Sequence, residues 1–151
     1  MDENRIPRGW KSVLFVALQF LSLGYIFLSG PLLAENPFLL AVELVGLGVG
    51  VWAVLAMGLG NFHIAPVPLT WSKMIRRGPY RLIRHPMYLA LLLTTFPLLL
   101  ADFSLSRLAV WLVLLLTLLF KMRFEEGLLA DKFPDYRTYM LSTARLIPGL
   151  Y

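Results

Sequence analysis

The sequence predicts an all-α, polytopic membrane protein with four transmembrane helices and a cytosolic C-terminal amphipathic helix. Hydrophobic residues make up 58% of the 151 residues, and charged residues only 15%. The apolar residues form blocks that are too long and continuous for the core of a soluble domain of this size. Because backbone amides in lipid must be satisfied within each segment, these blocks are expected to be helices.

We expect a single membrane domain over residues 1–151, with spans at about 11–30, 38–60, 86–101 and 108–120. The first block lacks a small-residue cleavage pattern after it, which favours a retained helix over a signal peptide. Short turns at 31–37 and 102–107 separate the spans, and Asp102 or Ser104 is suited to cap the fourth helix. Spans three and four are shorter than the ~20 residues that cross a hydrocarbon core, so Pro86 and Lys121 are expected near the headgroups.

The positions of the basic residues predict the topology. All but one of the 14 lysines and arginines lie at the N-terminus, in the connection between spans two and three, or from Lys121 onward. Only Arg107 falls in a turn on the opposite side. The positive-inside rule therefore puts both termini and the long connection in the cytoplasm. This charge distribution is equally explained by topology or by attraction to anionic headgroups, without any catalysis.

Composition also excludes several kinds of site. The chain has no cysteine, which rules out disulfides, thiolate nucleophiles and cysteine-ligated zinc. It has only two histidines, His63 and His85, so no protein-built metal site is expected. The net charge of +5 follows the membrane topology, and no nucleic-acid partner is expected.

The second span contains small residues suited to helix packing and one acidic residue within an apolar segment. Gly46 and Gly50 form a face of small residues that allows close helix packing, either within one subunit or in a homo-oligomer. Glu43 would be costly facing lipid. We expect it to reach toward the outer surface; the alternatives are a polar pocket or a pair with Gln19.

The C-terminal segment, residues 123–142, is interpreted as one or two amphipathic helices interrupted at Pro134. Its apolar face would consist of leucine, methionine and aromatic side chains. Such a segment could cover a site at the membrane surface.

The polar connection contains the first candidate site residues. Residues 72–80 are predicted to form a short helical turn ended by Gly78 and Pro79. Pro86 suits the first turn of the third span, so the positive end of that helix dipole lies beside Arg84 and His85 and favours an anionic group. The alternative is a simple helix cap with Tyr80 and Tyr88 as interfacial anchors.

The second group of candidates follows the fourth span. Lys121 and Glu125 are four residues apart and share one helical face, while Glu126 points elsewhere. By itself such a pair is usually a solvated surface interaction. Here the hairpin of spans three and four returns these residues to the membrane face that carries Arg84 and His85, so the two charged groups should share one pocket.

These motifs together resemble the isoprenylcysteine carboxyl methyltransferases and related phospholipid methyltransferase-like membrane proteins. The resemblance covers roughly residues 61–151, the expected catalytic part. It rests on an ordered set of short motifs: Gly78, Pro79 and Tyr80; Arg84, His85, Pro86, Met87 and Tyr88; Glu125 and Glu126; Phe133, Pro134, Asp135 and Tyr136; and Arg145, Leu146, Ile147 and Pro148. Such a set is specific for the superfamily but separates its members poorly.

The resemblance implies that S-adenosylmethionine binds at the cytosolic leaflet. The residues that match the cofactor motif are Lys73, Met74, Ile75, Tyr80, His85, Pro86, Met87 and Tyr88. By the same resemblance, Lys121 and Glu125 approach the methyl acceptor. A carboxylate acceptor needs a cation such as Lys121 or Arg84, whereas an amine or thiol must lose a proton, which Glu125 could accept.

Two positions depart from the family pattern. Ala90 stands where relatives often have glycine, which is expected to narrow the cofactor pocket slightly. Lys121 stands where the prenylcysteine enzymes have arginine. This change weakens specific carboxylate recognition, because lysine lacks the planar guanidinium that binds a carboxylate with two hydrogen bonds.

The sequence therefore predicts an S-adenosylmethionine-dependent methyltransferase that takes a lipid-like or apolar acceptor from the bilayer, with membrane lipids as its surroundings. Two alternatives remain at this point. One is an NADPH-dependent sterol-type reductase, whose members share a similar segment around Arg84, His85 and Pro86. The other is a non-enzymatic membrane scaffold that uses the Gly46 and Gly50 face.

Overall fold

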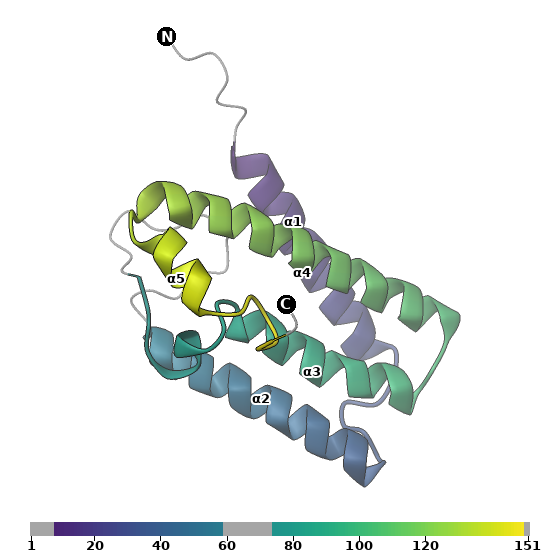
Figure 1. Ribbon diagram of the computed structural model, residues 1–151. Helices are drawn as coiled ribbons and strands as arrows, with labels where there is room; N and C mark the ends of the chain where they lie inside the picture. The colour runs from purple at the N-terminus through teal and green to yellow at the C-terminus, as the bar shows by residue number, and fades with distance from the viewer. Residues whose placement is uncertain (1–7, 59–73, 150–151) are drawn as a thin grey trace.

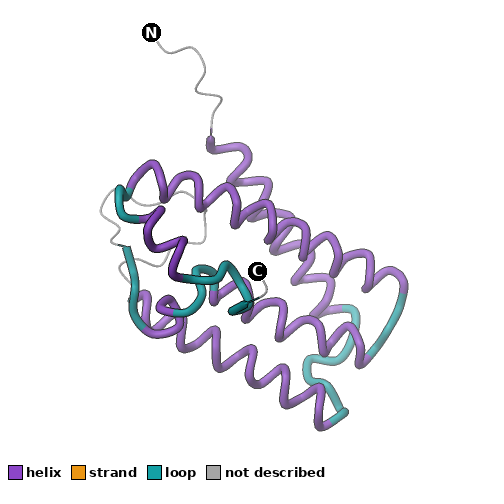
Figure 2. The backbone as a smooth tube through the Cα atoms, viewed as in Figure 1, coloured by secondary structure: helices purple, strands orange, loops and turns teal. Residues whose placement is uncertain are grey.

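The computed structural model describes residues 8–58 and 74–149. This part of the chain contains five α-helices and one 3₁₀ turn (Figure 2). Their bounds are α1 Arg8–Leu28, α2 Pro37–Met57, η1 Gly78–Arg81, α3 Pro86–Ala101, α4 Leu105–Lys132 and α5 Tyr136–Ser142. The prediction of an all-helical fold is confirmed for these residues.

Local sequence explains where the helices begin. The Asn36 side chain accepts hydrogen bonds from the backbone N–H groups of Phe38 and Leu39, at 2.9 and 3.3 Å, and Pro37 occupies the first turn of α2. Ser104 caps α4 by accepting a hydrogen bond of 3.2 Å from the Arg107 N–H. Of the two expected caps for the fourth helix, Ser104 is the correct one.

The helices form two packed pairs that are joined at the centre (Figure 1). α2 lies along α3, α1 packs against α4, and α3 contacts both α4 and α1. A core of buried leucine and isoleucine side chains joins α1, α3 and α4, and consists of Leu23, Ile26, Leu98, Leu114 and Leu118. This arrangement brings the start of α3 and the second half of α4 to the same end of the bundle, which we call the polar end.

Three helices are long and apolar enough to cross a membrane: α1, α2 and α4. α3 has the predicted bounds, but its 16 residues make it about 24 Å long, short of the ~30 Å hydrocarbon core. A fourth transmembrane span therefore stays a prediction.

The helix of the fourth span extends beyond residue 120, where the span itself was predicted to end. α4 continues without a break to Lys132, which makes it 28 residues and about 42 Å long. The sequence turns polar at Lys121, but polarity alone does not end a helix, and Gly127 costs only ~1 kcal/mol in a helix interior.

The predicted break at Pro134 is confirmed, because α4 ends before it and α5 starts after it.

Gly46 and Gly50 let α2 and α3 approach closely. A Cβ atom at Gly46 would lie 2.8 Å from the Thr94 backbone nitrogen and 2.9 Å from the Leu93 Cβ. At Gly50 it would lie 3.3 Å from the Ala90 Cβ. The small-residue face is thus occupied by α3 within one subunit. The Ala90 methyl group, which was expected to narrow a cofactor pocket, lies against α2.

Two buried charged residues hold the opposite end of the bundle together. Glu43 is 1% exposed and accepts a hydrogen bond of 3.0 Å from the Ala34 N–H in the loop that precedes α2. Neither its expected position at the outer surface nor the alternative pair with Gln19 is correct, because this loop folds back over the carboxylate. Arg107 is also buried and donates to the backbone carbonyls of Ile26 and Leu98 at 3.2 and 2.8 Å. These bonds tie α4 to α1 and α3.

The glycine contacts lead to a stability prediction. Gly46→Ala should destabilise the protein by about 1 to 3 kcal/mol, because the new methyl group would overlap the backbone of α3. Gly48→Ala is the matched control on the same helix, since a Cβ there meets nothing within 4 Å. Thermal unfolding in detergent should show a lower midpoint for Gly46→Ala and an equal or higher one for Gly48→Ala. Equal midpoints for both variants would contradict the packing.

Candidate functional site

The segment that leads into α3 depends on Gly78. This residue has φ +58°, and a Cβ atom there would lie 2.7 Å from the Ala56 side chain and 3.2 Å from the Trp52 indole nitrogen. Only glycine combines this backbone conformation with such a close approach to α2. The predicted helical turn over residues 72–80 is wrong where the structure describes it, because residues 74–77 are not helical and Gly78 begins the 3₁₀ turn.

Residues 143–146, which follow α5 and which we call the C-terminal segment from here on, form backbone hydrogen bonds with the residues that lead into α3. Ala144 donates its backbone N–H to the Leu82 carbonyl at 3.0 Å. In return, the carbonyls of Ala144 and Arg145 accept from the N–H groups of Arg84 and His85 at 2.9 and 3.1 Å. This short parallel pairing fixes the backbone that carries Arg84 and His85, and it places Arg145 beside them.

Glu126 is bound by three cationic or polar side chains from two other parts of the chain. It is 4% exposed. Its Oε1 atom lies 2.8 Å from the Arg84 Nε and 3.3 Å from the His85 Nε2, and its Oε2 atom accepts two bonds from Arg145, at 2.6 and 2.9 Å. We call these four residues the Glu126 cluster. The helical spacing correctly predicts that Glu126 points away from the Lys121 face, but it does not predict this role, and only the neighbouring Glu125 was expected in the site.

The neighbouring acid, Glu125, has different partners. Its Oε1 atom accepts a hydrogen bond of 2.5 Å from the Tyr88 hydroxyl, and its Oε2 atom lies 3.6 Å from the His85 Nδ1. The rings of His85 and Tyr88 stack with centroids 5.4 Å apart and an angle of 9°. The two nitrogens of His85 therefore face the two acids, and the expected meeting of Glu125 with the start of α3 is confirmed.

Lys121 is held by the first helix. The residue is 1% exposed. Its ammonium group donates a 2.9 Å hydrogen bond to the Gln19 Oε1 and lies 5.1 Å from the centre of the Tyr88 ring. A buried charge in an apolar span needs such partners. Gln19 thus belongs to the site, and α1 contributes to it directly. The sequence offered one indication, since Gln19 is a strongly polar side chain in the middle of the apolar first span.

Arg84 acts in the structure as a positioning residue. Besides Glu126, its guanidinium donates to the backbone carbonyls of Met140 and Thr143. These bonds hold the end of α5 and the C-terminal segment against the start of α3. A direct contact between Arg84 and a methyl acceptor stays a prediction.

Tyr80 has a buried hydroxyl group without a hydrogen-bond partner in the described part of the chain. Its own carbonyl accepts a 2.5 Å bond from the Tyr139 hydroxyl. Burial, and then the nearby Tyr139 and Glu125, raises the pKa of Tyr80 well above its usual value. The group is therefore a protonated donor at neutral pH.

The other predicted cofactor residues lie on both sides of Tyr80. Met74 and Ile75 are half-buried before η1. Pro86 occupies the first turn of α3 as predicted, and Met87 follows it there. Lys73 lies outside the described residues.

The Glu126 cluster should be important for stability. Glu126→Gln removes the charge that compensates Arg84 and Arg145 at a buried position, and should cost on the order of 3 kcal/mol. Arg123→Gln, an exposed position one turn away on α4, is the control and should change stability little. Chemical unfolding in detergent measures both, and an unchanged Glu126→Gln variant would contradict the cluster's role.

Comparison with known proteins agrees with this geometry. The family model described as phospholipid methyltransferase matches residues 38–136, which include α2, α3, α4, His85, Lys121 and both acids. Gln19 and Arg145 lie outside the matched range. No curated protein matches the chain significantly. The three long apolar helices and this family together fit an integral membrane protein and favour the methyltransferase interpretation over the reductase and the scaffold. The chain therefore belongs to the phospholipid methyltransferase family, within the wider group of membrane methyltransferases that resemble the isoprenylcysteine enzymes.

Proposed function

We propose that the protein transfers a methyl group from S-adenosylmethionine to a lipid-like acceptor at the cytosolic surface of the membrane. The observation that carries this proposal is the division between the two adjacent acids. Glu126 is bound by Arg84, His85 and Arg145, whereas Glu125 has only Tyr88 and His85 as described partners. Glu126 therefore holds the segments of the site together, and Glu125 is available to take part in the reaction.

The side chains fit S-adenosylmethionine, which supplies an electrophilic methyl group on a sulfonium. Tyr80 offers a buried hydroxyl donor that lacks a protein partner in the described residues. Lys73, Met74 and Ile75, together with the first turn of α3, would complete the binding residues. The stacked rings of His85 and Tyr88 keep Glu125 in place and exclude water from one side.

The acceptor is expected to approach Lys121. The ammonium group is oriented by Gln19 and by the Tyr88 ring, so its position is fixed before an anionic part of an acceptor enters between the helices. A carboxylate acceptor needs no further activation, while an amine or thiol would give up a proton to Glu125. Holding acceptor and donor in line can supply ~7 to 11 kcal/mol of the barrier.

The charge distribution supports a cytosolic location for this site. The basic residues gather at the polar end of the bundle and in the C-terminal part, and Arg107 lies at the opposite end. With four crossings, both termini would lie in the cytoplasm, and an acceptor dissolved in the membrane could reach Lys121 from between the helices.

Loss of Glu125 or His85 tests the proposed activity. Glu125→Gln keeps an acceptor for the Tyr88 hydroxyl but removes the charge, and His85→Ala removes the group between the acids. Each should lower methyl transfer by at least about 100-fold. The measurement uses radiolabelled S-adenosylmethionine with a total membrane lipid extract, and the labelled product identifies the acceptor. Glu35→Gln, an exposed acid before α2, is the matched control.

Full activity in both variants would refute the proposed site. Binding of NADPH without binding of S-adenosylmethionine would refute the reaction itself and favour a reductase.

A contribution of α1 to acceptor binding is tested at Gln19. Gln19→Leu leaves Lys121 without its 2.9 Å hydrogen bond and should reduce kcat/KM for the acceptor about 10- to 100-fold. The affinity for S-adenosylmethionine should stay unchanged, because the hydrogen bond of Gln19 goes to Lys121, which is not one of the proposed cofactor residues. Ser22→Ala, another buried polar position on α1, is the control. A parallel loss of cofactor affinity would contradict this assignment.

A further inference from the structure

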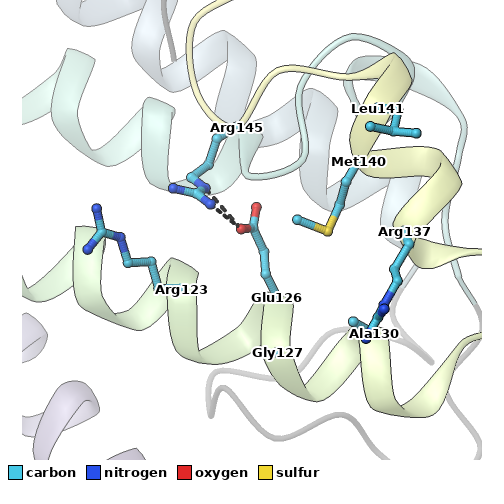
Figure 3. Close-up of a pocket in the computed structure, with 8 residues that line it drawn as sticks. All are labelled: Arg123, Glu126, Gly127, Ala130, Arg137, Met140, Leu141 and Arg145. Carbon is cyan, nitrogen blue, oxygen red and sulfur yellow. Dashed lines mark hydrogen bonds and ion pairs between the residues drawn. The ribbon is translucent and has the colours of Figure 1, made fainter.

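A groove of about 440 Å³ lies between α4 and α5, next to the Glu126 cluster (Figure 3). Gly127 forms part of its floor, and no side chain fills the space above it. Arg123 and Arg145 line one side and Arg137 the other, with Glu126 between them. Three arginine side chains therefore line the groove, and of these Arg145 binds the Glu126 carboxylate.

The charges in this groove are not balanced. Glu126 is already bound by Arg145 and by Arg84. Arg123 and Arg137 are exposed, come from different helices, and have no ion-pair partner within the described part of the chain. Two cationic side chains thus line the groove without an ion-pair partner among the described residues, which favours an anionic ligand at its edge.

The position of the groove indicates where this anion comes from. Gly127 lies 22 residues after Leu105, the first residue of α4, which corresponds to about 33 Å along the helix. The hydrocarbon core is ~30 Å thick, so Gly127 is at the level of the lipid headgroups if α4 crosses the membrane. Leu141, which also lines the groove, is 91% exposed and offers an apolar surface for the start of an acyl chain.

We propose that this groove is a binding site for the phosphate of an anionic phospholipid. Its lining does not include Glu125, His85 or Lys121, so the site is separate from the one proposed for methyl transfer. A phosphate held by Arg123 of α4 and Arg137 of α5 bridges two helices that otherwise pack sparsely. The bound lipid thereby stabilises α5 and the C-terminal segment that carries Arg145.

Native mass spectrometry of the full-length protein in detergent tests the site without any methyl donor. Titration with phosphatidylglycerol should yield one preferred lipid adduct, and phosphatidylcholine should bind at least about 10-fold more weakly. Arg123→Gln and Arg137→Gln should each weaken phosphatidylglycerol binding about 10-fold. Arg81→Gln is the matched control, because it removes an exposed charge at the same end of the bundle but outside the groove.

Three results would overturn the proposal. An equal loss in the Arg81→Gln variant would mean general attraction of anionic lipid to basic residues. Equal binding of the two lipids would remove the anionic preference. Occupation by inorganic phosphate that phosphatidylglycerol cannot displace would mean a soluble ligand. Unfolding midpoints of the variants in lipid-free detergent should match the unmodified protein, which separates lost binding from lost folding.

Discussion

The arrangement of the polar end depends on the carboxylate of Glu126. It joins α4 to Arg84 and His85 at the start of α3, and to Arg145 near the end of the chain. The backbone pairing of residues 82–85 with 144–145 reinforces the same connection. A buried charge without a partner raises the free energy of the folded state, so the start of α3, α4 and the C-terminal segment are held in the one arrangement that pairs all of these charges. Without this arrangement, His85 would not lie between the two acids.

The two consecutive acids contact different partners because a helix turns about 100° per residue. This rotation directs Glu126 into a set of cations and leaves Glu125 with Tyr88 and His85. Lys121, one turn before Glu125, is held from the other side by Gln19 of α1. The first helix lies outside the range matched by the family model, yet it supplies a direct partner to the site.

The opposite end of the bundle supplies rigidity. Arg107 binds carbonyl groups of α1 and α3, Glu43 holds the loop before α2, and Gly46 permits direct contact between α2 and α3. Since α4 is one continuous helix, these constraints also position residues 121–126 at the polar end. The same continuity carries α4 past the hydrocarbon level, where α5 folds back over it (Figure 1).

The sequence by itself determined the features that depend on neighbouring residues. Apolar blocks predicted the helices, Pro86 predicted the start of α3, Ser104 was one of two expected caps, and Pro134 predicted the break after α4. The paired motifs also predicted that Glu125 would meet His85. One unbroken helix joins the fourth span to residues 121–132, and this was missed because a change in polarity is not a change in backbone conformation. Only the tertiary structure decided that Glu126 binds Arg84 and Arg145, that Gln19 holds Lys121, and that Glu43 is buried. These pairs join residues far apart in the chain, and their geometry depends on how whole helices rotate and pack against one another, which no local pattern specifies.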